Sequence, residues 1–142
     1  MSPLIARTLP LSSIVLLLAC ACTRTSPDPT NELPSGAVDT PQPNTVVKPH
    51  VVVGGWALDD RRVRAVRIFV DGRFNTETTL NVQRPDATPR TSRYGHGHTR
   101  HGWNVRVDLG PNPGMRTIRV EVVDDDGATR DIGNFALTVE RW

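Results

Sequence analysis

The chain has 142 residues, and its 17 Lys and Arg against 15 Asp and Glu give a formal net charge of +2. A balance this close gives no electrostatic reason to expect a nucleic-acid partner, and we expect none. The two cysteines, Cys20 and Cys22, both stand near the N-terminus. The residues that follow them therefore contain no internal disulfide and must fold by core packing and hydrogen bonding.

Residues 1–19 have the pattern of an export signal. Arg7 is the one charged side chain before Cys20, and a short apolar run over 14–19 follows it. That run falls short of the about 20 apolar residues that span a bilayer. A charged start, a short apolar stretch and small residues at a cleavage site are typical of a secretory signal peptide.

The sequence Leu17-Leu18-Ala19-Cys20 resembles the lipobox of bacterial lipoproteins, in which cleavage occurs before a cysteine that carries a diacylglycerol. The resemblance implies that Cys20 is the lipid attachment site, and several acyl chains on one cysteine give a stable membrane anchor. Ala21, where inner-membrane lipoproteins carry Asp, indicates the outer membrane if the cell is Gram-negative. Two alternatives stay open: acylation of Cys22, or a secreted protein cut near Ala21.

Residues 20–44 are rich in Pro, Ser, Thr and Asp and contain few large apolar side chains. Such a segment buries too little surface to offset its conformational entropy. We therefore expect a disordered tether over 20–44, and a folded domain over 45–142.

From residue 45 onward, short β-branched runs alternate with turn signals, and no stretch keeps a helical period. Asp71-Gly72 is a strong hairpin signal, and Gly54-Gly55 suits a bulge or a close backbone approach. Alternation predicts that Trp103 faces the core. The sequence predicts about seven strands in an all-β, immunoglobulin-like antiparallel β-sandwich, with runs over 51–58, 63–70, 73–80, 103–109, 117–122 and 135–139.

Four blocks in order resemble a bacterial Ig-like domain of the type that reads GWALD, V-x-V-x-VDG, RPDV and SGF. They are Gly55-Trp56-Ala57-Leu58-Asp59, the run over 66–72, Arg84-Pro85-Asp86 and Gly102-Trp103. The resemblance implies an accessory module with no family-wide catalytic residues. The chain departs from the type at Ala87, where Val is usual, and in the Arg- and His-rich loop over 88–101.

That loop supplies the candidate partner-binding residues, because loops on rigid β scaffolds carry function. They are Tyr94, His96, His98, Arg100 and His101. The mixture of Arg and His suits an envelope protein, or an anionic glycan.

Imidazole side chains also bind metal ions, so a second hypothesis is a small metal-dependent hydrolase using His96, His98 and His101. Arg100 in the same loop would repel a cation. The leading hypothesis is a non-catalytic envelope module without a cofactor, which contacts the membrane through its lipid and either binds an envelope component or acts as a spacer. Trp142 is the candidate for an exposed aromatic.

Overall fold

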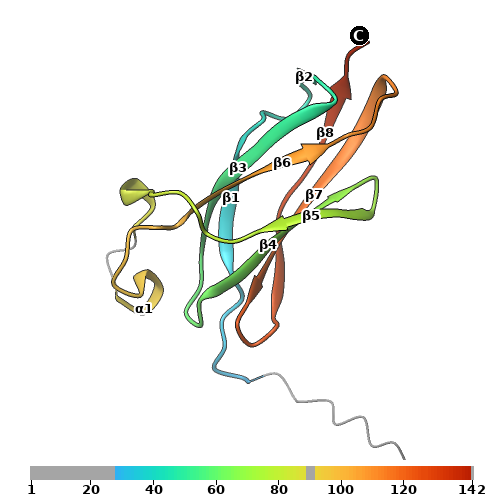
Figure 1. Ribbon diagram of the computed structural model, residues 1–142. Helices are drawn as coiled ribbons and strands as arrows, with labels where there is room; N and C mark the ends of the chain where they lie inside the picture. The colour runs from blue at the N-terminus through green and yellow to red at the C-terminus, as the bar shows by residue number, and fades with distance from the viewer. Residues whose placement is uncertain (1–27, 89–91, 142) are drawn as a thin grey trace, which may run out of the picture.

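The computed structural model describes residues 28–88 and 92–141, which form two facing β-sheets (Figure 1). One sheet has the strand order β1-β3-β6 and the other β2-β8-β7-β4-β5. Paired strands are antiparallel, except that β2 and β8 are parallel. The strands are β1 (Ser35–Thr40), β2 (Val46–Val47), β3 (His50–Leu58), β4 (Val63–Val70), β5 (Arg73–Thr78), β6 (Gly102–Asp108), β7 (Gly114–Asp124) and β8 (Thr129–Val139).

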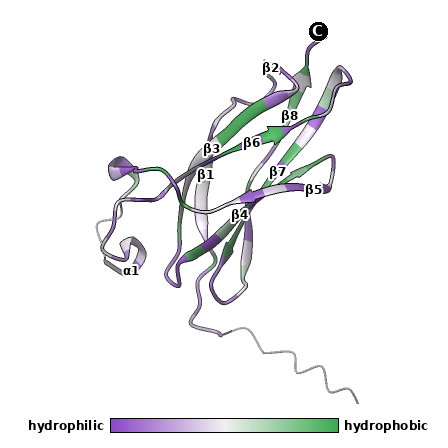
Figure 2. Ribbon diagram, in the orientation of Figure 1, coloured by the Kyte–Doolittle hydropathy of each residue, from purple (hydrophilic) through white to green (hydrophobic). Residues whose placement is uncertain are grey.

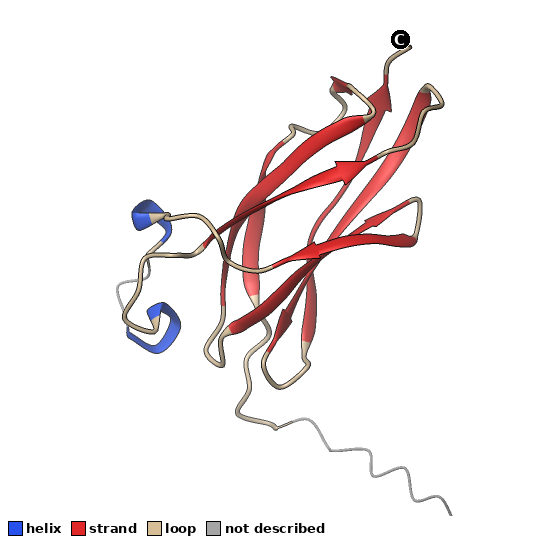
Figure 3. Ribbon diagram, viewed as in Figure 1, coloured by secondary structure: helices blue, strands red, loops and turns tan. Residues whose placement is uncertain are grey.

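This architecture confirms the predicted all-β, immunoglobulin-like sandwich, with eight strands in the described residues where about seven were expected. Within residues 28–88 and 92–141, helix is confined to a 3₁₀ turn, η1 (Pro85–Ala87), and one short turn, α1 (Ser92–Gly95) (Figure 3). Both lie in the long connection between β5 and β6. No helix in the part of the chain that the structure describes has the length and apolar character needed to cross a membrane.

The core lies between the sheets and is built from the apolar positions that alternate along each strand (Figure 2). Along β6, Trp103 and Val107 are buried while Asn104 and Arg106 are exposed, as the period of two predicts. The same alternation runs through β4, β7 and β8. The fully buried apolar side chains include Val53, Val66, Ile68, Trp103, Val107, Ile118, Val120, Val122 and Leu137.

The predicted hairpin at Asp71-Gly72 joins β4 and β5. Both residues have positive φ, 50° and 78°, which is the backbone of a two-residue hairpin turn. The Asp71 carboxylate also accepts a hydrogen bond from the backbone N–H of Thr117 on β7, with a distance of 2.8 Å.

The expected tether over 20–44 is wrong in its second half, because residues 35–40 form β1 and the domain therefore starts before residue 45. β1 pairs antiparallel with β3, with Ala37 opposite Trp56 and Val38 opposite Gly55. Val38 packs against the core. Just two apolar residues, Ala37 and Val38, mark this strand in a Pro- and Thr-rich segment, so its composition is that of a linker.

Gly54-Gly55 marks a close backbone approach, the second of the two structures expected there. A Cβ atom on Gly55 would lie 1.9 Å from the carbonyl oxygen of Ala37, so the side chain of any other residue would push β1 away from β3. Pairing between β3 and β6 stays regular through both glycines, and the irregularity lies in β1 between Val38 and Thr40.

The connection from β5 to β6 leaves the sandwich at one side, where Figure 1 shows α1 projecting near the end of β3 that leads into β4. Arg84 fixes this connection. Its guanidinium bonds Asp86 within the connection at 2.8 Å and Asp39 of β1 at 2.6 Å. Arg84 thus joins the connection to β1 through an ion-pair bridge.

Three of the sequence-based predictions concern residues outside the described ranges. They are the signal peptide over 1–19, the lipid attachment at Cys20 with its alternative Cys22, and the exposed aromatic Trp142.

Candidate ligand-binding cleft

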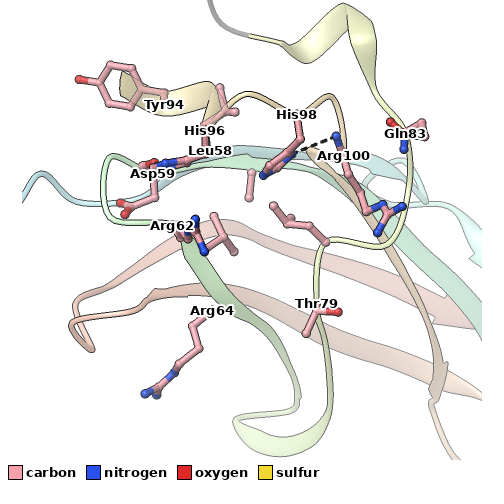
Figure 4. Close-up of a pocket in the computed structure, with 13 residues that line it drawn as sticks. Leu58, Asp59, Arg62, Arg64, Thr79, Gln83, Tyr94, His96, His98 and Arg100 are labelled. Atoms are coloured by element: carbon pink, nitrogen blue, oxygen red, sulfur yellow. Dashed lines mark hydrogen bonds between the residues drawn. The ribbon is translucent and has the colours of Figure 1, made fainter. Parts of the chain in front are cut away.

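A cleft of about 500 Å³ lies between the β3–β4 turn and the connection that precedes β6 (Figure 4). Four of the five candidate loop residues line it, namely Tyr94, His96, His98 and Arg100. The remaining lining residues are Ala57, Leu58, Asp59, Arg62, Val63, Arg64, Thr79, Leu80 and Gln83.

His96 fixes the loop against β3. It follows α1 with a left-handed backbone, φ 46°, which a non-glycine residue adopts at some cost. Its ring nitrogen Nε2 lies 2.8 Å from the main-chain carbonyl oxygen of Asp59. Because a carbonyl only accepts, Nε2 is the donor in this hydrogen bond. The loop is thereby held over one end of the cleft.

His98 and Arg100 form the opposite part of the loop. The backbone N–H of Arg100 donates to Nδ1 of His98 over 3.2 Å, which Figure 4 draws as a dashed line. Both side chains are exposed, so they present cationic or polar groups to a ligand in the cleft.

His101 does not belong to the binding surface, which corrects the fifth candidate. Its side chain is 1% exposed, and its backbone carbonyl accepts a hydrogen bond from the N–H of Ala57 at 2.9 Å. The ring stacks on His98, with centroids 4.9 Å apart. Burial lowers the pKa of His101, so the imidazole stays neutral under conditions that charge an exposed histidine.

The three histidines are not arranged as metal ligands. The rings of His96 and His98 are 6.5 Å apart between centroids, and His98 and His101 lie nearly parallel, face to face. Among the described residues, no group of three or more His, Cys, Asp or Glu side chains is placed to hold a metal ion. The structure therefore gives no support to the metal-dependent alternative.

Arginines from three separate segments contribute positive charge to the cleft. Arg62 lies in the β3–β4 turn, Arg64 in β4 and Arg100 in the loop, and all three are exposed. Each lies beyond ion-pair distance of every carboxylate in residues 28–88 and 92–141. Arg62 and Arg64 were not among the binding residues predicted from the sequence.

Asp59 is the carboxyl group of the cleft, and it is almost fully buried at 2% exposure. Burial raises its pKa to about 6, and the nearby charges of Asp124 and Asp60 add to the effect. Figure 4 shows its carboxyl group turned away from His98 and Arg100. Asp59 therefore shapes one end of the cleft, and its carboxyl group is directed away from Arg100.

A segment that precedes β1, residues 28–32, crosses this end of the molecule, and we call it the strap. Glu32 accepts a hydrogen bond from the Tyr94 hydroxyl and pairs with Arg93 at 2.9 Å. Asp28 pairs with Arg61 at 2.9 Å, and the Asn31 side chain donates to the buried carboxylate of Asp124 at 2.7 Å. The strap thus ties the loop that lines the cleft to both adjacent turns.

No family model matches the chain, and no curated protein matches it either. Among solved structures, it is similar to an endo-β-1,4-mannanase from Thermotoga petrophila, with 11% identity and a TM-score of 0.52, over 78% of this chain and 20% of that one. It is also matched by fibronectin(III)-like modules of Clostridium thermocellum CbhA, with 17% identity and a TM-score of 0.44, over 77% and 46%.

The chain thus spans less than half of each of these two solved chains. At such low identity the mannanase likeness concerns the fold alone. It agrees with the β-sandwich described above. Membership of the GWALD type of bacterial Ig-like domain stays a prediction.

Proposed function

We propose that the chain is a non-catalytic binding module of the bacterial cell envelope. In this proposal a lipid on Cys20 anchors it, in the outer membrane if the cell is Gram-negative, and the cleft binds another envelope component, a protein or a glycan. The observation that carries the proposal is the cleft itself, in which Arg62, Arg64 and Arg100 face solvent around an apolar floor. Concave sites with few convergent polar groups are where proteins bind ligands.

Backbone strain at the cleft supports the same conclusion. Arg62 has φ 90° and His96 has φ 46°, and both line the cleft. Such conformations cost about 1–3 kcal/mol each and persist mainly at functional sites and turns that the surroundings hold in place. Here Arg62 is held by its carbonyl, which accepts a hydrogen bond from the N–H of Asp125 at 3.1 Å.

The state of the acid–base groups favours binding over catalysis. A general base needs its proton-accepting atom within hydrogen-bond reach of the substrate. The carboxyl group of Asp59 is buried and turned aside, and Nε2 of His96 is occupied by a main-chain carbonyl. The lining of the cleft, as the structure describes it, contains no serine or cysteine.

The test is co-purification from membranes in which the full-length protein carries His98→Ala, Arg64→Ala and Arg100→Ala together. We expect this variant to lose its envelope partner while its melting temperature stays unchanged, because all three side chains are exposed. The matched control removes three exposed arginines outside the cleft, through Arg73→Ala, Arg106→Ala and Arg130→Ala.

Retention of the partner by the cleft variant would reject the assignment of the cleft. If the protein acts purely as a spacer, we expect a different set of results. Neither triple variant would then change co-purification or cell phenotype, whereas loss of the Cys20 anchor would.

A further inference from the structure

Some arginines around the cleft form ion pairs and others do not, and this difference indicates the class of ligand. This inference rests on the proposed function. Arginines adjacent to the cleft residues are already engaged. Arg61 pairs with Asp28 of the strap at 2.9 Å, and Arg93 pairs with Glu32 at 2.9 Å. Two acidic side chains of the strap, Asp28 and Glu32, are therefore paired with arginines that do not line the cleft.

Arg62 shows how the fold separates the two sets. The side chain of Arg61 is directed to Asp28 of the strap. Arg62 has a positive φ, and its own side chain lies at the cleft. A guanidinium stays protonated at all physiological pH values and presents a planar fork of donors to oxyanions. Arg62, Arg64 and Arg100 thus leave three such forks open to solvent.

The forks are spread along the cleft. In Figure 4, Arg64 and Arg100 extend away from each other, on opposite sides of the lining residues. A single phosphate or carboxylate is best held by forks that converge on one point. Separated forks match a chain that carries an anionic group at intervals.

The floor between them is apolar. Ala57 is fully buried, and Leu58, Val63 and Leu80 are half-buried around it. A sugar ring presents C–H groups on its face and hydroxyl or acidic groups at its edge. An apolar floor with a basic rim is complementary to that shape, and the exposed Thr79 and Gln83 add polar groups at the edge.

We propose that the cleft binds an acidic polysaccharide, with Arg62, Arg64 and Arg100 each contacting a carboxylate or sulfate along the chain while a sugar ring lies over the half-buried Leu80. His98 adds a further donor beside Arg100. The carboxyl group of Asp59 is turned away from His98 and Arg100.

The experiment is a binding titration of the detergent-solubilised full-length protein with polygalacturonate and with dextran sulfate, which separate the carboxylate and sulfate sources. Neutral dextran and single-stranded DNA of equal charge are the comparison probes. We expect one of the two acidic glycans to bind more tightly than either comparison probe.

The variant Arg62→Gln/Arg64→Gln/Arg100→Gln should bind that glycan about tenfold more weakly, the factor that three modest exposed ion pairs give together. The control Arg73→Gln/Arg106→Gln/Arg130→Gln has the same net charge, and should stay within about twofold of the native protein. Equal losses in the two variants, or DNA binding as tight as glycan binding, would mean general attraction for polyanions and would overturn the proposal.

Failure of this ligand class is distinguishable from failure of the cleft. Suppose that the native protein binds neither acidic glycan, but the His98→Ala/Arg64→Ala/Arg100→Ala variant loses its partner in co-purification. The ligand is then of another class, and the proposed function stands. If co-purification is also unchanged, both fail.

Discussion

Asp59 is buried at the junction of the cleft and the strap, and its surroundings disfavour its charge. Oδ2 accepts a hydrogen bond from the N–H of Arg61 at 2.6 Å, whereas Oδ1 is buried and has no hydrogen-bond partner among the described residues. Burial, followed by the charges of Asp124 and Asp60, raises its pKa to about 6 from an ordinary value of 3.8. The folded protein therefore holds this proton more tightly than the unfolded chain does.

The sign of the pH dependence follows from that difference. A raised folded-state pKa contributes stability below about pH 4, and the contribution is lost as pH rises through about 6. Asp59→Asn removes the charge and keeps an acceptor for Arg61. We expect it to be more stable than the native protein at pH 7.5, by up to about 3 kcal/mol, with the difference vanishing near pH 4.

Urea unfolding of both proteins from pH 4 to pH 7.5 measures this difference. The buried His101 has a lowered pKa and changes stability in the opposite direction, but it does so in both proteins and cancels in the comparison. If Asp59→Asn is the less stable protein at pH 7.5, the ionised carboxylate stabilises the fold and the account of this residue is wrong.

Gly55 is the residue on which the three-stranded sheet depends. Its missing Cβ leaves room for the carbonyl oxygen of Ala37, and Ala at this position would place a carbon 1.9 Å from that oxygen. We expect Gly55→Ala to lower the free energy of unfolding by about 3 kcal/mol, as overpacking in a rigid site does.

Gly97→Ala is the matched control, because its Cβ would meet no atom within 4 Å and only its φ of 71° is unfavourable. It should cost about 1 kcal/mol. Denaturant titration measures both values, and equal losses would show that β1 does not constrain the β3 backbone.

At the scale of the elements, the strands that carry strong alternation were predictable. β4, with Val66 and Ile68 inward, and β6, with Trp103 inward, have the expected faces because two residues per period leave one side for the core. β1 was missed, since its contribution to the sheet comes from backbone pairing and small residues. Hydrogen bonding of that kind leaves little trace in hydrophobicity.

The loop residues of the cleft could be predicted from the sequence, but the cleft residues from other segments could not. The Arg- and His-rich loop is visible as composition, so Tyr94, His96, His98 and Arg100 were found. Arg62 and Arg64 come from a turn and a strand at least 30 positions before these four residues, and no local signal links them to the loop. His101 was misassigned, because only the three-dimensional packing shows that the chain has re-entered the core there.

The strap links β1 to the cleft loop, so we expect its contacts to restrict the motion of that loop. Glu32 holds both Arg93 and Tyr94, and the Tyr94 pKa is raised because its hydroxyl donates to this carboxylate. We expect Glu32→Ala to speed amide exchange in residues 93–96 while exchange in β7 stays unchanged, because β7 lies in the other sheet.

Hydrogen–deuterium exchange followed by mass spectrometry measures this, with Glu77→Ala, an exposed carboxylate on β5, as the control. Slow exchange in 93–96 of the Glu32→Ala protein would show that the loop is held by other contacts.

For the whole molecule, the proposal joins an N-terminal lipid to a binding cleft through a rigid sandwich. The strap, which is the first described segment, lies at the same end of the domain as the cleft, because it contacts Tyr94 and Arg93 of the cleft loop.

The anchor is tested by Cys20→Ala in the full-length protein. Without the acylated thiol, we expect unprocessed precursor or protein released from the membrane. Cys22→Ala is the matched control and should fractionate as the native protein does. Mature, membrane-bound Cys20→Ala would move the attachment to Cys22, or remove the lipid from the account.

The central claim is that the cleft contacts a ligand in the cell, and site-specific crosslinking tests it most directly. A photoreactive amino acid is placed at position 79, an exposed residue of the cleft, or at position 130 on β8, which does not line it. The account predicts a crosslinked product from position 79 that Arg62→Gln/Arg64→Gln/Arg100→Gln strongly reduces, and none from position 130. Equal products from both positions, or none from position 79, would contradict it.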